Sequence, residues 1–139
     1  MAWQTECTDA YLRERLETLY QACERSGPAH CLKMTTGTRS NGDGQIKLRW
    51  MKDGVSKQAA PRPWAVELHL RGIAIPRGSD ASHLCGEGLR GCVDIDHIVV
   101  EDHSYNLDRR DCHKMTVCPC GCDFVHRVRP ICDHDPKCL

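Results

Sequence analysis

Three side chains in this sequence have chemistry suited to hydrolysis. His83 stands two residues before Cys85, so a metal on that cysteine would fix the backbone of His83 and leave its imidazole unbound. A neutral imidazole can take a proton from water near neutral pH. Asn106 offers a hard amide oxygen, which suits Mg²⁺ and not Zn²⁺. Magnesium held there could neutralise the departing oxygen of a phosphodiester, while Arg49 holds the non-bridging phosphate oxygens.

Cysteine and histidine are frequent and interleaved, with 11 Cys and 8 His among 139 residues. Zinc takes four thiolate or imidazole ligands in a tetrahedron, and the chain offers two such sets. The first set is Cys31, Cys85, Cys92 and His97. The second set is Cys112, Cys132, His134 and Cys138. The first set would tie a distant strand to a local loop, and the second would pin the last segment of the chain. We expect two structural zinc ions.

A further cluster lies between the first two members of the second set. It comprises Cys118, Cys120, Cys122 and His126. Pro119 and Gly121 make this a tight loop that could wrap a third zinc by itself. The cluster could also replace ligands of the second set, or be a group of spare thiols, and the sequence leaves these alternatives open.

Large apolar side chains are scarce, with one Phe, three Trp and three Tyr. A single core this small needs cross-links, which are either disulfides or bound metals. The cysteine count is odd and no export signal precedes the first helix, which favours zinc over disulfides. The alternative is a secreted disulfide protein whose signal has been removed. No apolar run is long enough to cross a membrane, so we expect an intracellular protein, with the nucleus as one place of action.

Charge is zero overall but unevenly distributed. Residues 33–77 hold nine basic side chains and only three acidic ones, whereas residues 79–106 hold six acidic side chains and one base, Arg90. A basic segment beside an acidic one indicates a phosphate-facing surface next to a site for a cation. A solvated charged surface would give the same pattern.

Periodicity divides the chain into four segments of one domain. Residues 1–28 are predicted to form a helix on the stripe Leu12, Leu16, Leu19 and Cys23, with Thr8 as N-cap and Gly27-Pro28 as its end. Residues 30–78 form an antiparallel sheet, residues 79–111 carry the chemistry and end in a short helix from 101 to 111, and residues 112–139 form a zinc-held loop.

The predicted sheet has period two from Ile46 to Trp50 and again from Val66 to Leu70. Residues 41–44, Asn-Gly-Asp-Gly, predict a hairpin turn between a strand near Cys31 and a strand at 45–51, and Asp53-Gly54 predicts another turn. One face would be apolar. The other face would carry Lys47, Arg49, His69 and Arg71. Such a ribbon fits the DNA major groove, although an ordinary half-buried sheet has the same pattern.

The order of the residues in both zinc sets, with His83 and Asn106 between them, resembles the His-Cys box homing endonucleases. These are a branch of the ββα-metal, or His-Me finger, nucleases, and the resemblance runs from His30 onward. It implies an α+β fold with little hydrophobic core, an antiparallel sheet, an N-terminal helix and zinc-stabilised loops. It also implies that His83 activates water, that Asn106 binds the single Mg²⁺, and that Arg49 contacts the scissile phosphate.

Three departures from the family pattern stand out. The Cys85–Cys92 gap is long, the cluster of residues 118–126 is an insertion, and the chain ends one residue after Cys138, without the tail that family dimers exchange. We therefore expect either a monomer or a homodimer on double-stranded DNA, with no membrane partner. His103, one helical turn before Asn106, could line the site. The expected activity is Mg²⁺-dependent DNA hydrolysis. The alternatives are an inactive zinc-stabilised DNA-binding module and a purely structural or protein-binding zinc domain.

Overall fold

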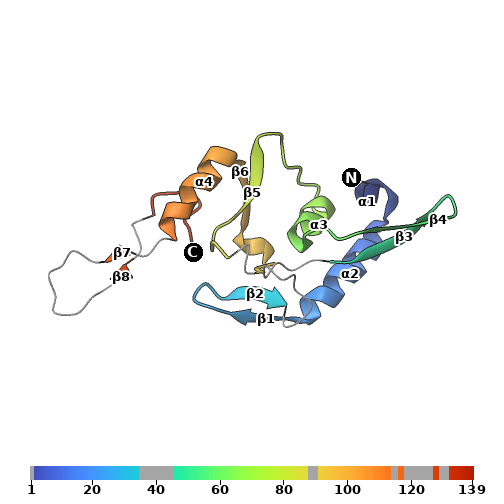
Figure 1. Cartoon of the computed structure of the whole chain (residues 1–139), viewed down its shortest axis with the longest axis horizontal. Helices are drawn as coiled ribbons and strands as arrows, with labels where there is room; N and C mark the ends of the chain where they lie inside the picture. Colours follow the sequence, from blue (N-terminus) through green and yellow to red (C-terminus); the bar gives the residue numbers. More distant parts are fainter. Residues whose placement is uncertain (1, 35–45, 88–90, 114–115, 118–126, 129–131) are drawn as a thin grey trace. The chain divides into compact units, whose positions relative to one another are not determined.

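The computed structural model describes two compact units (Figure 1). The described residues are 2–34, 46–87, 91–113, 116–117, 127–128 and 132–139. The first unit comprises Met1–Ala74 and Glu87–Asp96, and the second comprises Ile75–Gly86 and His97–Leu139. Among the described residues, no helix has both the length and the apolar character needed to cross a membrane.

Two helices open the first unit, α1 (Ala2–Glu6) and α2 (Asp9–Gln21). The prediction of Thr8 as N-cap is confirmed, because its hydroxyl oxygen accepts a hydrogen bond from the Tyr11 N–H at 3.2 Å. The stripe residues Leu12, Leu16 and Leu19 are buried as expected, whereas the fourth, Cys23, lies beyond the last helical residue, Gln21. These leucines belong to the apolar core, whose other buried members are Trp3, Cys7, Ile46, Leu48, Val66 and Val93.

The predicted end of this helix at Gly27-Pro28 is wrong. Helix α2 ends at Gln21, and the next residues form β1 (Cys23–Ser26), which pairs antiparallel with β2 (Cys31–Met34). Gly27 and Pro28 therefore lie in the turn of a hairpin. The backbone N–H and C=O groups of β1 form their hydrogen bonds with β2. In a continued helix, the same groups would have bonded within the helix.

A second hairpin joins β3 (Leu48–Lys52) to β4 (Val55–Ala59). Its turn is the predicted Asp53-Gly54, where both residues adopt positive φ, at 50° and 76°. The predicted partner of this strand is wrong: among the described strands, β3 pairs with β4 and β2 with β1. The expected turn at residues 41–44 lies outside the described residues.

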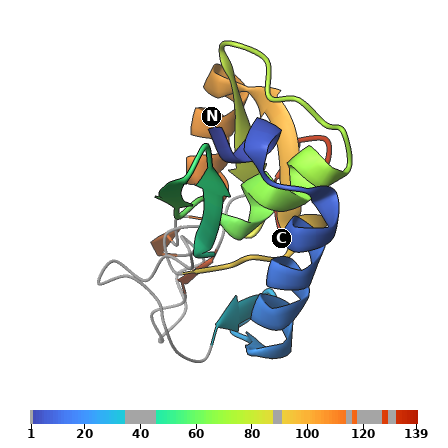
Figure 2. The ribbon, with the colours of Figure 1, turned by 90° about the vertical axis from the view of Figure 1, so that its right-hand side faces the viewer.

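The prediction of a strand from Val66 to Leu70 is also wrong, because Pro63–Leu70 form helix α3. Pro63 occupies the first helical position, where its fixed φ fits and its missing N–H costs nothing. Helix α3 packs against α2 (Figure 2). Two residues predicted on the polar face of the sheet therefore lie elsewhere: Arg71 caps α3, and His69 packs edge-on against the Trp3 ring at 5.4 Å.

The second unit contains a ββα arrangement. Strand β5 (Ser79–His83) pairs antiparallel with β6 (Ile98–Asp102), which follows a short 3-10 helix, η2 (Ile95–His97). Helix α4 (His103–Cys112) begins directly after β6 and contacts both strands. A short pair, β7 (Thr116–Val117) with β8 (Arg127–Val128), follows. The predicted helix is confirmed with its start shifted by two residues, and the mixture of helices and small antiparallel sheets is the expected α+β class.

Candidate metal centres

The second predicted zinc set comes together within the second unit. The His134 Nδ1 lies 3.2 Å from Cys112 Sγ, 3.4 Å from Cys132 Sγ and 3.9 Å from Cys138 Sγ. All four ligand atoms lie within 4.8 Å of one another. A tetrahedral zinc with ordinary Zn–S and Zn–N bonds separates sulfur from nitrogen by about 3.6 Å. The donor set therefore fits zinc in both chemistry and spacing.

The protein environment prepares this set for a cation. The Cys138 backbone N–H donates a hydrogen bond to Cys132 Sγ at 3.3 Å, and this bond lowers the pKa of the Cys132 thiol. Burial raises the pKa of the neighbouring Cys112 thiol. A thiolate at Cys132 is thus favoured before the remaining thiols lose their protons, and zinc binds thiolates.

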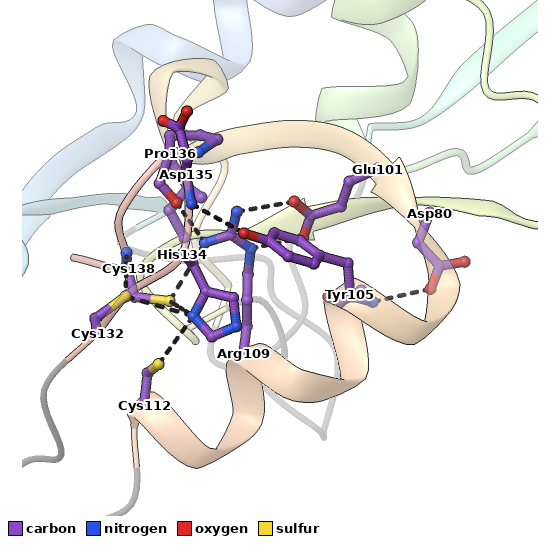
Figure 3. A network of polar contacts seen from close by, with 12 residues as sticks. Asp80, Glu101, Tyr105, Arg109, Cys112, Cys132, His134, Asp135, Pro136 and Cys138 are labelled. Carbon is purple, nitrogen blue, oxygen red and sulfur yellow. Dashed lines mark hydrogen bonds and ion pairs between the residues drawn. The ribbon is translucent and has the colours of Figure 1, made fainter.

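Helix α4 and the last segment of the chain hold the set in place (Figure 3). Cys112 is the last residue of α4, and Tyr105 on the same helix packs edge-on against the His134 ring at 4.9 Å. The Tyr105 hydroxyl oxygen accepts a hydrogen bond from the Asp135 backbone N–H at 3.0 Å. One helix thereby supplies a ligand and orients another.

Arg109 is a residue of this centre that the sequence analysis missed. Its guanidinium binds the Glu101 carboxylate through two hydrogen bonds of 2.6 and 2.8 Å. Its Nη1 donates to the Pro136 carbonyl oxygen at 2.7 Å and to Cys138 Sγ at 3.4 Å. Burial raises the pKa of Glu101, but the hydrogen bonds and the charge of Arg109, together with contributions from Ser82 and His134, leave the pKa below its usual value. The sequence alone does not pair Glu101 with Arg109, because the contact depends on how α4 packs against β6.

His113, to which the sequence analysis assigned no role, connects α4 with the residues that follow β5. Its Nε2 lies 2.9 Å from the Leu84 carbonyl oxygen and its Nδ1 lies 3.1 Å from the Arg109 carbonyl oxygen. The Leu139 backbone N–H also donates to the Leu84 oxygen, at 2.8 Å. The loop that begins at Leu84 is therefore tied to both the end of α4 and the C-terminal residue.

The first predicted zinc set draws two ligands from each unit. In the first unit, Cys31 begins β2, and the Val93 N–H bonds the Leu32 carbonyl oxygen at 2.9 Å, which brings Cys92 beside β2. In the second unit, the Leu84 N–H bonds the His97 carbonyl oxygen at 2.7 Å, so Cys85 and His97 lie at the same end of the β5–β6 hairpin. All four ligands are buried.

The two sets, each of three cysteines and one histidine, are compatible with two zinc ions. The third predicted cluster, Cys118, Cys120, Cys122 and His126, lies outside the described residues.

The predicted base and the predicted magnesium ligand both belong to the ββα unit. His83 is the last residue of β5 and is half-buried, and Asn106 lies in the first half of α4. The Asn106 Nδ2 donates a hydrogen bond to Asp80 on β5 at 2.9 Å. Side chains alternate along a strand, so His83 leaves β5 on the face opposite to Asp80.

The basic side chains predicted to face DNA are only partly gathered. Arg49 is exposed on β3, and Lys47 precedes the strand. A cavity of about 410 Å³ lies beside them, lined by Lys47, Leu48, Arg49, Gln58, Ala59 and Ala60. Exposed Lys47 and Arg49 alternate with buried Ile46 and Leu48, which confirms the predicted period of two in this stretch. Arg71, the C-cap residue of α3, is not part of this ribbon.

Comparison with known proteins gives one match. The family model for the zinc-binding loop region of homing endonuclease matches residues 30–139, which is most of the chain and includes both zinc sets, His83 and Asn106. Comparisons with curated proteins and with solved structures gave no match. The α+β architecture with its ββα unit agrees with the His-Me nuclease fold. The chain therefore belongs to the family defined by the zinc-binding loop region of homing endonucleases.

Proposed function

We propose that this protein is a Mg²⁺-dependent DNA endonuclease. The observation that carries the proposal is the ββα unit, in which a hairpin strand ends at His83 and the following helix carries Asn106. Membership in a homing endonuclease family implies DNA as the substrate. The Cys112 set at the end of α4 supports the proposal, because it anchors the helix that carries Asn106.

In this proposal, each polar residue has one task. His83 takes a proton from a water molecule, whose oxygen attacks the phosphorus as the bond to the 3′ oxygen breaks. The products are a 5′-phosphate and a 3′-hydroxyl. Asn106 would hold Mg²⁺ through its side-chain oxygen, and Mg²⁺ held there would supply positive charge for the leaving oxygen. Arg49, exposed on β3, contacts the backbone phosphate, and Lys47 adds to the same basic surface.

We assign two structural zinc ions to the two Cys₃His sets. In the first set, backbone pairing brings Cys92 beside β2, which begins with Cys31, and brings Cys85 and His97 to one end of the hairpin. In the second unit, a zinc ion bound by Cys85 and His97 would hold the chain two residues after His83. Zinc would then fix the backbone that carries the base without using its imidazole.

A second candidate function is a catalytically inactive, zinc-stabilised DNA-binding module. One observation favours it: His83 leaves β5 on the face opposite to Asp80, the residue that binds Asn106. A shared active site requires the His83 imidazole and the Asn106 amide to reach the same phosphate. The two functions differ in whether DNA is cut, and they agree that DNA is bound.

A plasmid assay separates them. With zinc-loaded protein and Mg²⁺, supercoiled DNA should be nicked or linearised. His83→Ala and Asn106→Ala should each lower the rate by at least about 100-fold, as expected for the loss of a general base or a metal ligand. His30→Asn serves as a matched control, because His30 is exposed, adopts a positive φ that Asn tolerates, and lies outside the proposed site.

The assay has two outcomes that would reject the nuclease. One is intact plasmid under Mg²⁺ together with salt-dependent DNA binding that persists in EDTA, which is the result expected of the inactive module. The other is cleavage at the same rate by wild type and His83→Ala, which would show that the activity does not depend on the proposed base.

A further inference from the structure

Asp80 is a carboxylate of the ββα unit that the sequence analysis did not assign. It lies on β5 opposite Glu101 of β6, and its side chain points toward α4 (Figure 3). Its Oδ2 accepts a hydrogen bond from Asn106 Nδ2 at 2.9 Å and lies 2.5 Å from His103 Nδ1. About 33% of the Asp80 side chain is exposed, so the cluster lies at the surface of the unit, within reach of solvent ions.

The register of the hairpin explains why two helical residues meet two carboxylates. Asn106 and Arg109 are three residues apart on α4, so they lie on one face of the helix. Asp80 and Glu101 are direct cross-strand partners, so their side chains lie on one face of the hairpin. Asn106 binds Asp80 and Arg109 binds Glu101. The ion pair of Arg109 with Glu101 holds α4 against the hairpin, and so it sets where along β5 Asn106 meets Asp80.

The contact between Asp80 and Asn106 selects one orientation of the amide. An ionised carboxylate is only an acceptor, so it can face the nitrogen of the amide and not the oxygen. With Nδ2 held by Asp80, the Asn106 Oδ1 points away from the carboxylate. A hard cation binds that oxygen.

We infer that Asp80 is a positioning residue for Asn106, because its carboxylate holds the amide nitrogen and so presents Oδ1 to a divalent cation. His103 contacts the same carboxylate oxygen and restrains Asp80. The inference rests on the proposed role of Asn106 as a metal ligand. It assigns Asp80 no direct bond to the ion.

Two substitutions at Asp80 test this assignment. Asp80→Asn keeps an acceptor oxygen for Asn106 Nδ2 and for His103 but removes the charge, whereas Asp80→Ala removes the acceptor. We expect Asp80→Ala to weaken metal binding by about 10- to 100-fold, the usual effect of losing a partner that orients a ligand. Asp80→Asn should remain within about 3-fold of wild type, since the neutral hydrogen bond still orients the amide. Asp108→Ala removes an exposed carboxylate of α4 and is the control that should have no effect.

The readout uses zinc-loaded full-length protein without DNA. Mn²⁺, a hard cation that stands in for Mg²⁺, should broaden the Asn106 side-chain amide signals in ¹H–¹⁵N spectra, and a titration gives its affinity. The same spectra in the absence of Mn²⁺ should show the Asn106 amide signals shifted in Asp80→Ala. The Mg²⁺ concentration for half-maximal DNA cleavage should rise most in Asp80→Ala, little in Asp80→Asn and not at all in Asp108→Ala.

Each outcome separates the inference from the proposed function. If wild type binds Mn²⁺ at Asn106 but does not cut DNA, the nuclease proposal fails while the positioning role stands. If Asp80→Asn loses as much affinity as Asp80→Ala, the carboxylate binds the ion directly and the positioning role is wrong. Equal affinity in all variants, or no Mn²⁺ effect on Asn106, also overturns the inference.

Discussion

Arg109 joins three parts of the second unit through one side chain. Only about 2% of it is exposed, and it contacts Glu101 on β6, the Pro136 carbonyl oxygen and Cys138 Sγ. Its guanidinium also lies 5.1 Å from the centre of the Tyr105 ring. A buried charge is stable only when its donors are satisfied. Arg109 meets this condition by binding a carboxylate, a carbonyl oxygen and a proposed zinc ligand together.

Replacing Arg109 by alanine should therefore be severely destabilising. We expect Arg109→Ala to lower the free energy of unfolding by about 3–5 kcal/mol, because the Glu101 side chain, which is only 10% exposed, would lose its partner. Urea denaturation of zinc-loaded protein measures the loss. The double variant Glu101→Gln, Arg109→Met is the control, since it removes both charges at similar size and should lose less. Equal losses in the two variants would mean that packing, and not the unpaired carboxylate, accounts for the effect.

At the residue scale, sequence reasoning grouped the candidate zinc ligands but did not find the residues that support them. The candidate ligands follow a characteristic order of cysteine and histidine, so Cys112, Cys132 and His134 could be grouped before any fold was known. Asp80 and Arg109 have no such signature. Their roles arise from the register of β5 with β6 and from the packing of α4, which are tertiary facts. A lone Asp or Arg in a sequence is ordinarily a solvated charge.

At the scale of elements, α3 shows how a short apolar run misleads. Val66, Leu68 and Leu70 alternate with polar residues, yet the segment is helical. Periodicity alone does not separate strand from helix in so few residues. The informative signals were at the ends, where Pro63 occupies the first position and Gly72 follows the last turn.

The end of α3 is a Schellman motif. The Ile73 N–H bonds the Leu68 carbonyl oxygen at 2.9 Å and the Gly72 N–H bonds the His69 oxygen at 3.0 Å, with Gly72 at φ 71°. A Cβ at Gly72 would meet nothing within 4 Å. Gly72→Ala should thus cost about 1 kcal/mol through backbone strain alone. Urea denaturation checks this value.

The control for that prediction is Gly72→Asn, because Asn adopts the left-handed conformation more readily than Ala. It should lose less stability than Gly72→Ala. Equal stability of Gly72→Ala and wild type would show that the end of α3 rearranges without cost.

At the scale of the whole molecule, the apolar core belongs to one unit. Every member of the buried hydrophobic cluster, from Trp3 to Val93, lies in the first unit. Among the described residues of the second unit, the buried side chains include three proposed zinc ligands, Cys85, His97 and Cys112, together with the charged Arg109. We therefore expect a unit with so little buried apolar surface to depend on metal binding for its stability.

Zinc occupancy can be counted directly. Native mass spectrometry should find two zinc ions on wild type and one on Cys132→Ser, which lacks a ligand of the second set. Cys23→Ser is the matched control and should keep two, because Cys23 lies outside both sets and donates to the Leu19 carbonyl oxygen, as a serine can. Three ions on wild type would assign a third site to the predicted cluster of residues 118–126.

Removal of zinc should unfold the two units unequally. With excess chelator, hydrogen exchange should lose protection across β5, β6 and α4, since metal binding supplies much of the folding free energy there. Amides of α2 should keep most of their protection, because Leu12, Leu16 and Leu19 remain buried in the apolar core. Restoring zinc should recover the lost protection. Protection lost equally in both units would mean that the first unit does not hold its fold without the metals, and protection retained in α4 would remove zinc as the source of its stability.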